Sequence, residues 1–148
     1  RGNDRSQIKS IFSGECDVAL INHYYYGKLI NSKDPTHTKW AESVNIIIPN
    51  QGANDRGAHV NISGGGIAKH SKNLDEAKKF MEFLVSKKAQ ALYASINYEY
   101  PVIDGISLPN TLTAWGDFKE DNVSIASLAD LSGESQKIID ELSLLLSQ

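Results

Sequence analysis

The sequence predicts an α/β fold, and three patterns along its 148 residues support that prediction. Short apolar runs bounded by turn residues are typical of buried strands. Longer stretches repeat apolar residues at the spacing of an amphipathic helix. The two kinds of segment follow one another as strand, helix, strand, strand and helices, an order that favours the α/β class.

The first predicted elements surround a run of aromatic residues. Residues 6–12 have helical spacing, and residues 17–21 form a short apolar run that predicts a strand. Residues 23–31 then return to helical spacing. The stretch 22–27, Asn-His-Tyr-Tyr-Tyr-Gly, therefore lies at a strand-to-helix switch, where open α/β sheets usually bind ligands.

The middle of the chain predicts loops, two strands and two helices. Residues 31–38 are polar and include a proline, which indicates a loop. Strands are expected at residues 44–48 and 58–62. Two helices in series follow, the first opened by Asn73 and the second by Ser86, which are both residue types that cap helix N-termini.

Composition excludes several classes of protein. The net charge is −3 and no Lys/Arg run exists, so a nucleic-acid partner is not expected. No apolar stretch approaches the ~18 residues that a membrane-spanning helix needs. The single cysteine, Cys16, rules out an intrachain disulfide. The sequence starts at Arg1 without an initiator Met or the apolar core of a signal peptide. We therefore expect that a leader has been removed or that the chain is a piece of a longer protein.

Adjacent tyrosines suggest a hard metal ion as ligand. Successive helical residues point about 100° apart, so Tyr24 and Tyr25 can converge on one ligand only at a helix tip. The positive end of the helix dipole favours phenolate there. Free tyrosine has a pKa of about 10, and ferric iron, which prefers anionic oxygen ligands, would help it to ionise.

Two further roles for the tyrosines stay open on chemistry alone. Aromatic clusters are more often packing, with hydroxyls that simply find a hydrogen bond. Stacking on a carbohydrate is the other role. The four histidines show no paired metal-binding spacing, and residues 64–66, three glycines, lack the Lys-Ser/Thr of a phosphate loop. No nucleophile–base arrangement is evident, so an enzyme is not expected.

Five segments of the chain resemble one known family in the same order. They are residues 14–29, 59–66, 71–73, 83–90 and 98–102. In these segments the chain is similar to the ferric-ion-binding proteins, the solute receptors of iron(III) ABC transporters. The resemblance covers most of residues 7–103, whereas residues 104–148 match only loosely.

The resemblance implies specific roles around the tyrosines. The family's motif is Asn-x-Tyr-Tyr, and its two tyrosines, which match Tyr24 and Tyr25, ligate iron. Asn22 matches a position that helps to bind an accompanying anion in some members, and whether an anion binds with the iron stays open. Tyr26 lies one position beyond the motif and is expected to support the ligands or to pack.

The resemblance also implies a two-lobed type II periplasmic binding protein fold, with mixed sheets flanked by helices. Residues 1–49 would belong to the C-terminal lobe and 58–103 to the N-terminal lobe, with an inter-lobe crossing at 50–57. Residues 104–148 would end in a helix from about 133 to 146, in a lobe that is left open. Members are about twice as long as one such chain, so a missing N-terminal portion would supply the remaining iron ligands.

The expected function is that of an extracytoplasmic, periplasmic receptor. It would bind ferric ion through the tyrosinates and deliver it to an inner-membrane ABC permease, without catalysis. Two alternatives remain at this point. One is a receptor of the same fold for a small organic anion or sugar, and the other is a stand-alone enzyme domain.

Overall fold

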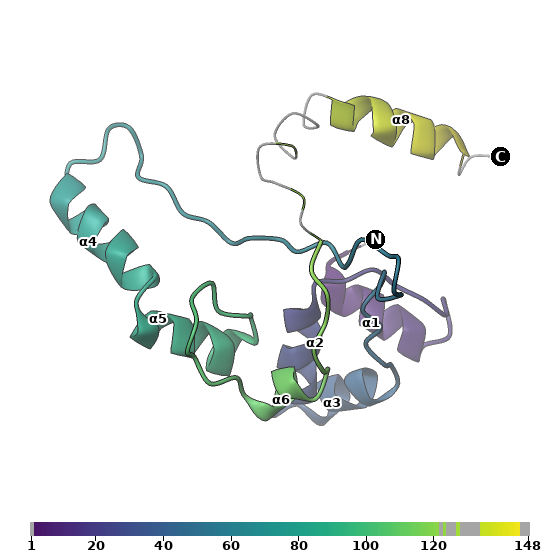
Figure 1. Ribbon diagram of the computed structural model, residues 1–148. Coiled ribbons are helices and arrows are strands. Elements are labelled where there is room, and N and C mark those ends of the chain that lie inside the picture. The colour runs from purple at the N-terminus through teal and green to yellow at the C-terminus, as the bar shows by residue number, and fades with distance from the viewer. Residues whose placement is uncertain (1, 122, 124–126, 128–133, 146–148) are drawn as a thin grey trace. The chain divides into compact units, whose positions relative to one another are not determined.

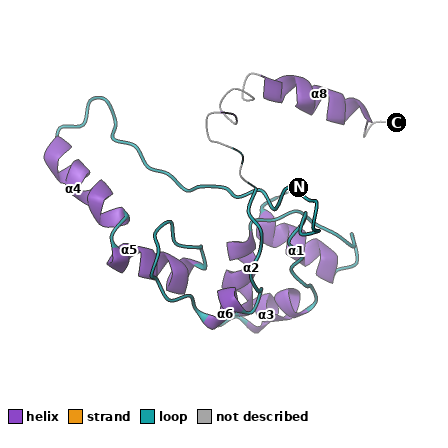
Figure 2. Ribbon diagram, viewed as in Figure 1, coloured by secondary structure: helices purple, strands orange, loops and turns teal. Residues whose placement is uncertain are grey.

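A computed structural model shows the protein as helices joined by loops (Figure 1). The residues that it describes are 2–121, 123, 127 and 134–145. Within these residues no β-strand is formed (Figure 2), and the one β-type pairing is an isolated parallel bridge between Ala58 and Glu120. None of the described helices is long and apolar enough to cross a membrane.

The chain divides into two compact units, each built from two stretches of sequence. The first unit contains Arg1–Ile47 and Ser63–Asp117. The second contains Ile48–Ile62 and Phe118–Gln148. The predicted assignment of segments to lobes follows different boundaries and stays a prediction.

Three short helices form the core of the first unit. At its centre lie Ile8, Leu29 and Ala41, each exposed by 1% or less. Burying an aliphatic side chain of the size of leucine contributes about 1.5–3 kcal/mol, so these contacts hold the three helices together. The helices are α1 (Asp4–Phe12), α2 (His23–Ile30) and α3 (Pro35–Glu42).

Local capping explains where α1 and α3 begin. The side-chain oxygen of Asn3 accepts a hydrogen bond from the Ser6 backbone N–H at 3.1 Å. Asp34 caps α3 in the same way, and Pro35 occupies the first helical position, where its missing N–H costs nothing. The expectation of a loop over residues 31–38 is therefore wrong beyond Asp34, because the proline starts a helix there.

The rest of the first unit begins with two helices in series, as predicted, and contains two shorter helical elements after them. Ser86 caps the second of them by accepting from the Ala89 N–H at 3.3 Å. Asn73 precedes the first without a side-chain capping bond. The first helix buries none of its residues, and Phe80 is 59% exposed. The elements are α4 (Leu74–Leu84), α5 (Lys87–Leu92), the π-helix η1 (Tyr93–Asn97) and α6 (Asn110–Thr113).

The second unit joins its two stretches of chain by backbone hydrogen bonds. The Ala58 N–H donates to the Lys119 carbonyl, and the Asp121 N–H donates to the Ala58 carbonyl, both at 2.8 Å. Arg56 forms an ion pair with Asp121 at 2.7 Å. The unit also contains α8 (Ser135–Leu145), which confirms the predicted terminal helix within the described residues.

The three predicted strands are not formed. Residues 17–21, 44–48 and 58–62 lie in loops of the described chain, apart from the bridge at Ala58. Four apolar side chains of these runs are exposed, those of Val18, Leu20, Ile47 and Ile62, by as much as 94% for Leu20, whereas Ile21 and Val44 pack against the three-helix core. A strand is stable only when a neighbouring strand accepts and donates its backbone hydrogen bonds. The described residues supply no such neighbour, so the apolar runs stay unpaired as strands.

Candidate functional site

Tyr24 and Tyr25 lie in the first turn of α2, next to each other in space as well as in sequence. Their ring centroids are 4.5 Å apart with the planes tilted by 33°. Their side chains share a hydrogen bond. Asn22, just before the helix, has extended backbone angles (φ −78°, ψ 127°), so the chain is turning where the two hydroxyls converge.

The surroundings of the tyrosine pair raise the pKa of Tyr24. The hydrogen bond to Tyr25 is the main cause that raises the pKa of Tyr24 to about 12, and burial and the charges of Asp4 and Glu99 act in the same direction. Without a bound cation, Tyr24 is therefore a neutral phenol at pH 7. Only a strongly polarising ligand would replace that proton.

Two cationic side chains lie over the tyrosine rings. The Lys28 ammonium is 5.2 Å from the centre of the Tyr24 ring. The Arg5 guanidinium is 6.0 Å from the centre of the Tyr25 ring. Each of these contacts is a cation–π interaction with the neutral ring.

The N-terminus of α1 is tied to the beginning of α2. One oxygen of the Asp4 carboxylate, Oδ2, accepts hydrogen bonds from the Asn22 backbone N–H at 2.6 Å and from its side-chain Nδ2 at 3.0 Å. Asn22 does not cap α2 with its own side chain. The residue that the resemblance assigns to an anion therefore donates to a carboxylate of this chain.

His23 supports the first turn of α2 from the side of the aromatic residues. Its ring centroid is 5.3 Å from those of Tyr100 and Trp115. Burial lowers the pKa of His23, while a hydrogen bond with the Tyr98 backbone acts in the opposite direction. Its buried Nε2 has no hydrogen-bond partner within the described part of the chain. His23 is thus a neutral, half-buried packing residue beside Tyr24.

Tyr26 and Gly27 face the packed side of α2. The Tyr26 ring lies 6.0 Å from that of Trp115 and packs against the three-helix core. A Cβ atom on Gly27 would come within 2.7 Å of the Tyr98 Cβ, so only glycine allows this close approach. Tyr98 itself has a left-handed backbone (φ 58°). These contacts fit the packing role, one of the two expected for Tyr26.

The tyrosine pair by itself does not make up a set of metal ligands. Among the residues that the structure describes, no group of three or more His, Cys, Asp or Glu side chains could hold a metal ion. Tyr24 and Tyr25 together offer two hard oxygen ligands, which suit a trivalent cation. A ferric ion held by these two side chains would need further ligands from elsewhere.

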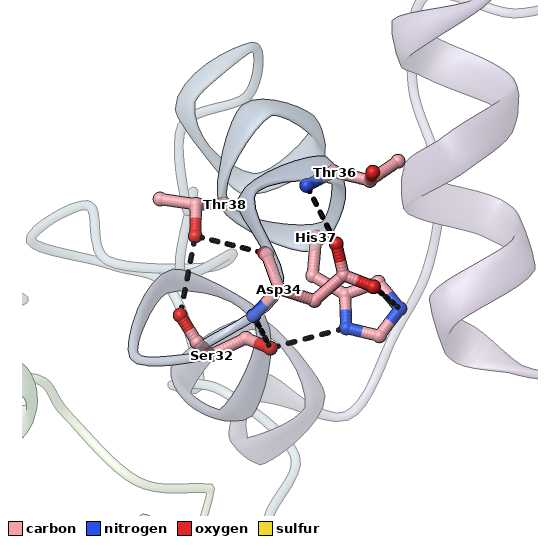
Figure 3. Close-up of polar contacts among 5 residues, drawn as sticks. All are labelled: Ser32, Asp34, Thr36, His37 and Thr38. Atoms are coloured by element: carbon pink, nitrogen blue, oxygen red, sulfur yellow. Dashed lines mark hydrogen bonds and ion pairs between the residues drawn. The ribbon is translucent and has the colours of Figure 1, made fainter.

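A serine, a histidine and an aspartate meet at the start of α3 (Figure 3). Ser32 Oγ lies 3.1 Å from Nδ1 of His37, whose Nε2 lies 3.9 Å from the Asp34 carboxylate. However, that carboxylate accepts from the Thr36 N–H at 2.8 Å, which is the main cause that lowers the pKa of Asp34. Ser32 Oγ in turn accepts from the Asp34 N–H. The cluster closes the turn before α3, a role that the Asp-Pro dipeptide could have indicated.

Comparison with known proteins identifies a family for the chain. Residues 1–91 match the family described as bacterial extracellular solute-binding protein. The curated protein "Iron uptake protein A1" of Synechocystis sp. is 45% identical over 141 residues, which are 95% of this chain and 39% of that protein.

Solved structures of ferric-binding proteins share the arrangement of the chain. A ferric binding protein from Campylobacter jejuni superposes with a TM-score of 0.89 at 43% identity, over 95% of this chain and 44% of that one. A Trichodesmium protein in complex with iron and citrate ligands superposes with a TM-score of 0.83 at 40% identity, again over 95% and 44%. These likenesses are consistent with the predicted type II periplasmic binding fold. The chain spans less than half the length of the proteins it matches.

Proposed function

Because this chain belongs to the family of bacterial extracellular solute-binding proteins, we propose that it is part of a periplasmic receptor for ferric iron. The receptor would deliver iron(III) to an inner-membrane ABC transporter, without catalysis. The names of its relatives, an iron uptake protein and ferric binding proteins, support this choice of cargo.

The observation that carries the proposal is the convergence of Tyr24 and Tyr25. Two phenol oxygens that share one hydrogen bond are close enough to bind one ion. They also stand at the N-terminus of a helix, whose dipole favours negative charge on them. Packing requires neither feature, because His23 and Tyr26 already pack α2 against Trp115.

Iron binding by Tyr24 and Tyr25 would release protons from their hydroxyl groups. The ion would replace the hydroxyl protons of both tyrosines, because ferric iron takes anionic oxygen ligands. The raised pKa of Tyr24 makes the competition with protons stronger. Affinity would therefore fall as pH falls, by up to about a hundredfold per pH unit if both protons are released. Acidification or reduction of the iron would each favour release.

The remaining iron ligands would come from a portion of the protein that its relatives have and that this chain does not span. The chain covers 44% of the Campylobacter jejuni protein. In such an arrangement two lobes would close on the ion, and residues 1–49, which contain α2, would belong to one of them. The tyrosine pair would then be the contribution of one lobe.

A ferric-iron titration of the full-length protein tests the proposal. Ligation by tyrosinate produces a visible charge-transfer band, whose growth measures binding. We expect Tyr24→Phe and Tyr25→Phe each to weaken binding by at least about tenfold, since each removes one charged ligand. Tyr26→Phe is the matched control, which removes a neighbouring hydroxyl outside the pair and should leave the band and affinity unchanged.

Three contrary outcomes would each lead to a different function. If the double variant Tyr24→Phe, Tyr25→Phe keeps both the colour and the affinity of the parent protein, the tyrosines are not the ligands. A colourless protein that binds a sugar or an organic anion would indicate a different receptor of the same fold. Turnover of a substrate without metal would indicate an enzyme.

A further inference from the structure

Asp4 and Asn22 are joined by two hydrogen bonds at the N-terminal end of α2, where the tyrosines lie. A single carboxylate oxygen accepts both the backbone and the side-chain N–H of Asn22, at 2.6 and 3.0 Å. The two residues are 18 positions apart, and Asp4 belongs to a different helix, α1. Asn22 is the residue immediately before α2, so this contact fixes the point from which Tyr24 and Tyr25 project.

From this geometry we propose that the Asp4 carboxylate acts as a built-in anion of the iron site. It holds the amide of Asn22 and the positive end of α2, so that iron binding needs no free carbonate or phosphate at that position. Asp4 acts as a positioning residue and does not bind the metal. The inference rests on the proposed function and states how that site is completed electrostatically.

Helix N-termini attract anions because their N–H groups lack partners within the helix and their dipole is positive there. At the start of α2 the Asn22 side chain makes no capping bond, and Asp4 takes a backbone N–H directly. Its carboxylate thus already takes up two N–H donors at this position, both of Asn22. A second anion beside it would meet a like charge at short range, which is unfavourable.

The charges around the pair are consistent with this role. The Asp4 carboxylate is close enough to Tyr24 to influence its ionisation, as is Glu99. Arg5, next to Asp4 in sequence, places its guanidinium over the Tyr25 ring, and Lys28 places its ammonium over the Tyr24 ring. Before its remaining ligands are counted, a trivalent ion bound by two phenolates carries one net positive charge, and Arg5 and Lys28 add two more. Asp4 supplies a fixed negative charge nearby, as does Glu99, so a dissolved anion has less positive charge to balance.

The test is the anion dependence of iron binding by the full-length protein. Ferric iron is supplied from a neutral hydroxamate chelator, in buffer freed of carbonate and phosphate, and the tyrosinate band is followed with and without added carbonate or phosphate. For the parent protein we expect the affinity to change by less than about twofold on adding either anion. For Asp4→Asn we expect a loss of about tenfold without anion and recovery when either anion is added.

Asp17→Asn is the matched control, because Asp17 is an exposed carboxylate in the loop between α1 and α2. It should behave as the parent protein does in both buffers. Circular dichroism should show the same helix content in all three proteins. Recovery by an added anion is a readout that a general loss of structure would not produce.

Three results would overturn the proposal while leaving the proposed function intact. They are a parent protein whose affinity rises tenfold or more with added anion, an Asp4→Asn variant that matches the parent in both buffers, and a weakened variant that no anion rescues. If the parent protein shows no tyrosinate band in any buffer, the proposed function itself is wrong, and this inference fails with it.

Discussion

The helix cluster around the tyrosines buries apolar side chains that the loops on either side of it leave exposed at several positions. In the three-helix cluster of α1, α2 and α3, Leu29 is 1% exposed. In the loop that leads into α2, Leu20 is 94% exposed, and in the loop after α3, Ile47 is 83% exposed. Aliphatic side chains are therefore buried at the centre of the cluster and exposed at Leu20 and Ile47, while Ile21 and Val44 of the same loops pack against the cluster.

This contrast follows from the way in which helices and strands satisfy their backbone hydrogen bonds. A helix satisfies its own backbone hydrogen bonds, so three helices need only each other's apolar faces to form a core. A strand needs a partner for every second backbone group. The chain spans 39% of its Synechocystis relative, so we propose that the partners of the apolar loops lie in the part that it does not span.

Truncating a leucine in each region should give the greatest difference between them. Leu29→Ala should lower the free energy of unfolding of this 148-residue chain by about 2–5 kcal/mol, because it leaves a cavity among buried side chains. Leu20→Ala should change it by less than about 0.5 kcal/mol, as surface substitutions do. Urea unfolding followed by circular dichroism measures both. Equal losses would show that Leu20 is buried in solution, and the contrast between helices and loops would not hold.

A smaller difference is expected between two asparagines that each precede a helix. Asn3 caps α1 through its side chain, whereas Asn73 precedes α4 without such a bond. Asn3→Ala should therefore lower the free energy of unfolding by about 0.5–2 kcal/mol, the usual cost of losing a cap. The matched Asn73→Ala should cost only a few tenths of a kcal/mol by the same comparison. A larger loss at Asn73 than at Asn3 would contradict the contrast between the two helices.

The weakest effect is a dependence of stability on pH through His23. Burial lowers the pKa of His23 below its ordinary value of 6.5, so the unfolded chain binds its proton more tightly than the folded one. Stability should be unaffected by this group above pH 6.5 and should decline as pH falls below it, with a slope of at most about 1.4 kcal/mol per pH unit. Partial exposure of the ring makes the real slope smaller.

Chemical unfolding between pH 7.5 and 5 checks this sign. His23→Phe, which keeps an aromatic ring against Trp115, should remove part of the acid-induced loss. His70→Phe, at an exposed histidine, is the control and should retain the loss. A parent protein that becomes more stable on acidification through this range would contradict the lowered pKa of His23.

Local patterns in the sequence were sufficient to predict most helices. The predicted helices near residues 6–12 and 23–31 correspond to α1 and α2, and Ser86 caps α5 as expected. The exceptions are α6, which was not predicted, and α3, where the polar stretch around Pro35 was read as a loop. The convergence of two adjacent tyrosines followed from helix geometry alone, because only the first turn of a helix allows it.

Contacts between distant residues could not be predicted in the same way. Nothing near Asn22 in the sequence indicates that Asp4 would accept both of its N–H groups. Likewise, the contact of His23 with Trp115 joins residues more than ninety positions apart. The expected strands failed for a related reason, since periodicity shows a segment's preference but does not show whether a pairing partner is present.

Iron ligation by the tyrosine pair is tested most directly by the structure of the iron-loaded, full-length protein, with the metal located by its anomalous scattering. We predict one ferric ion bonded to the phenolate oxygens of both Tyr24 and Tyr25, with the Asp4–Asn22 contact intact beside it. Iron bound at another place, with the two tyrosine hydroxyls still sharing their hydrogen bond, would contradict this prediction.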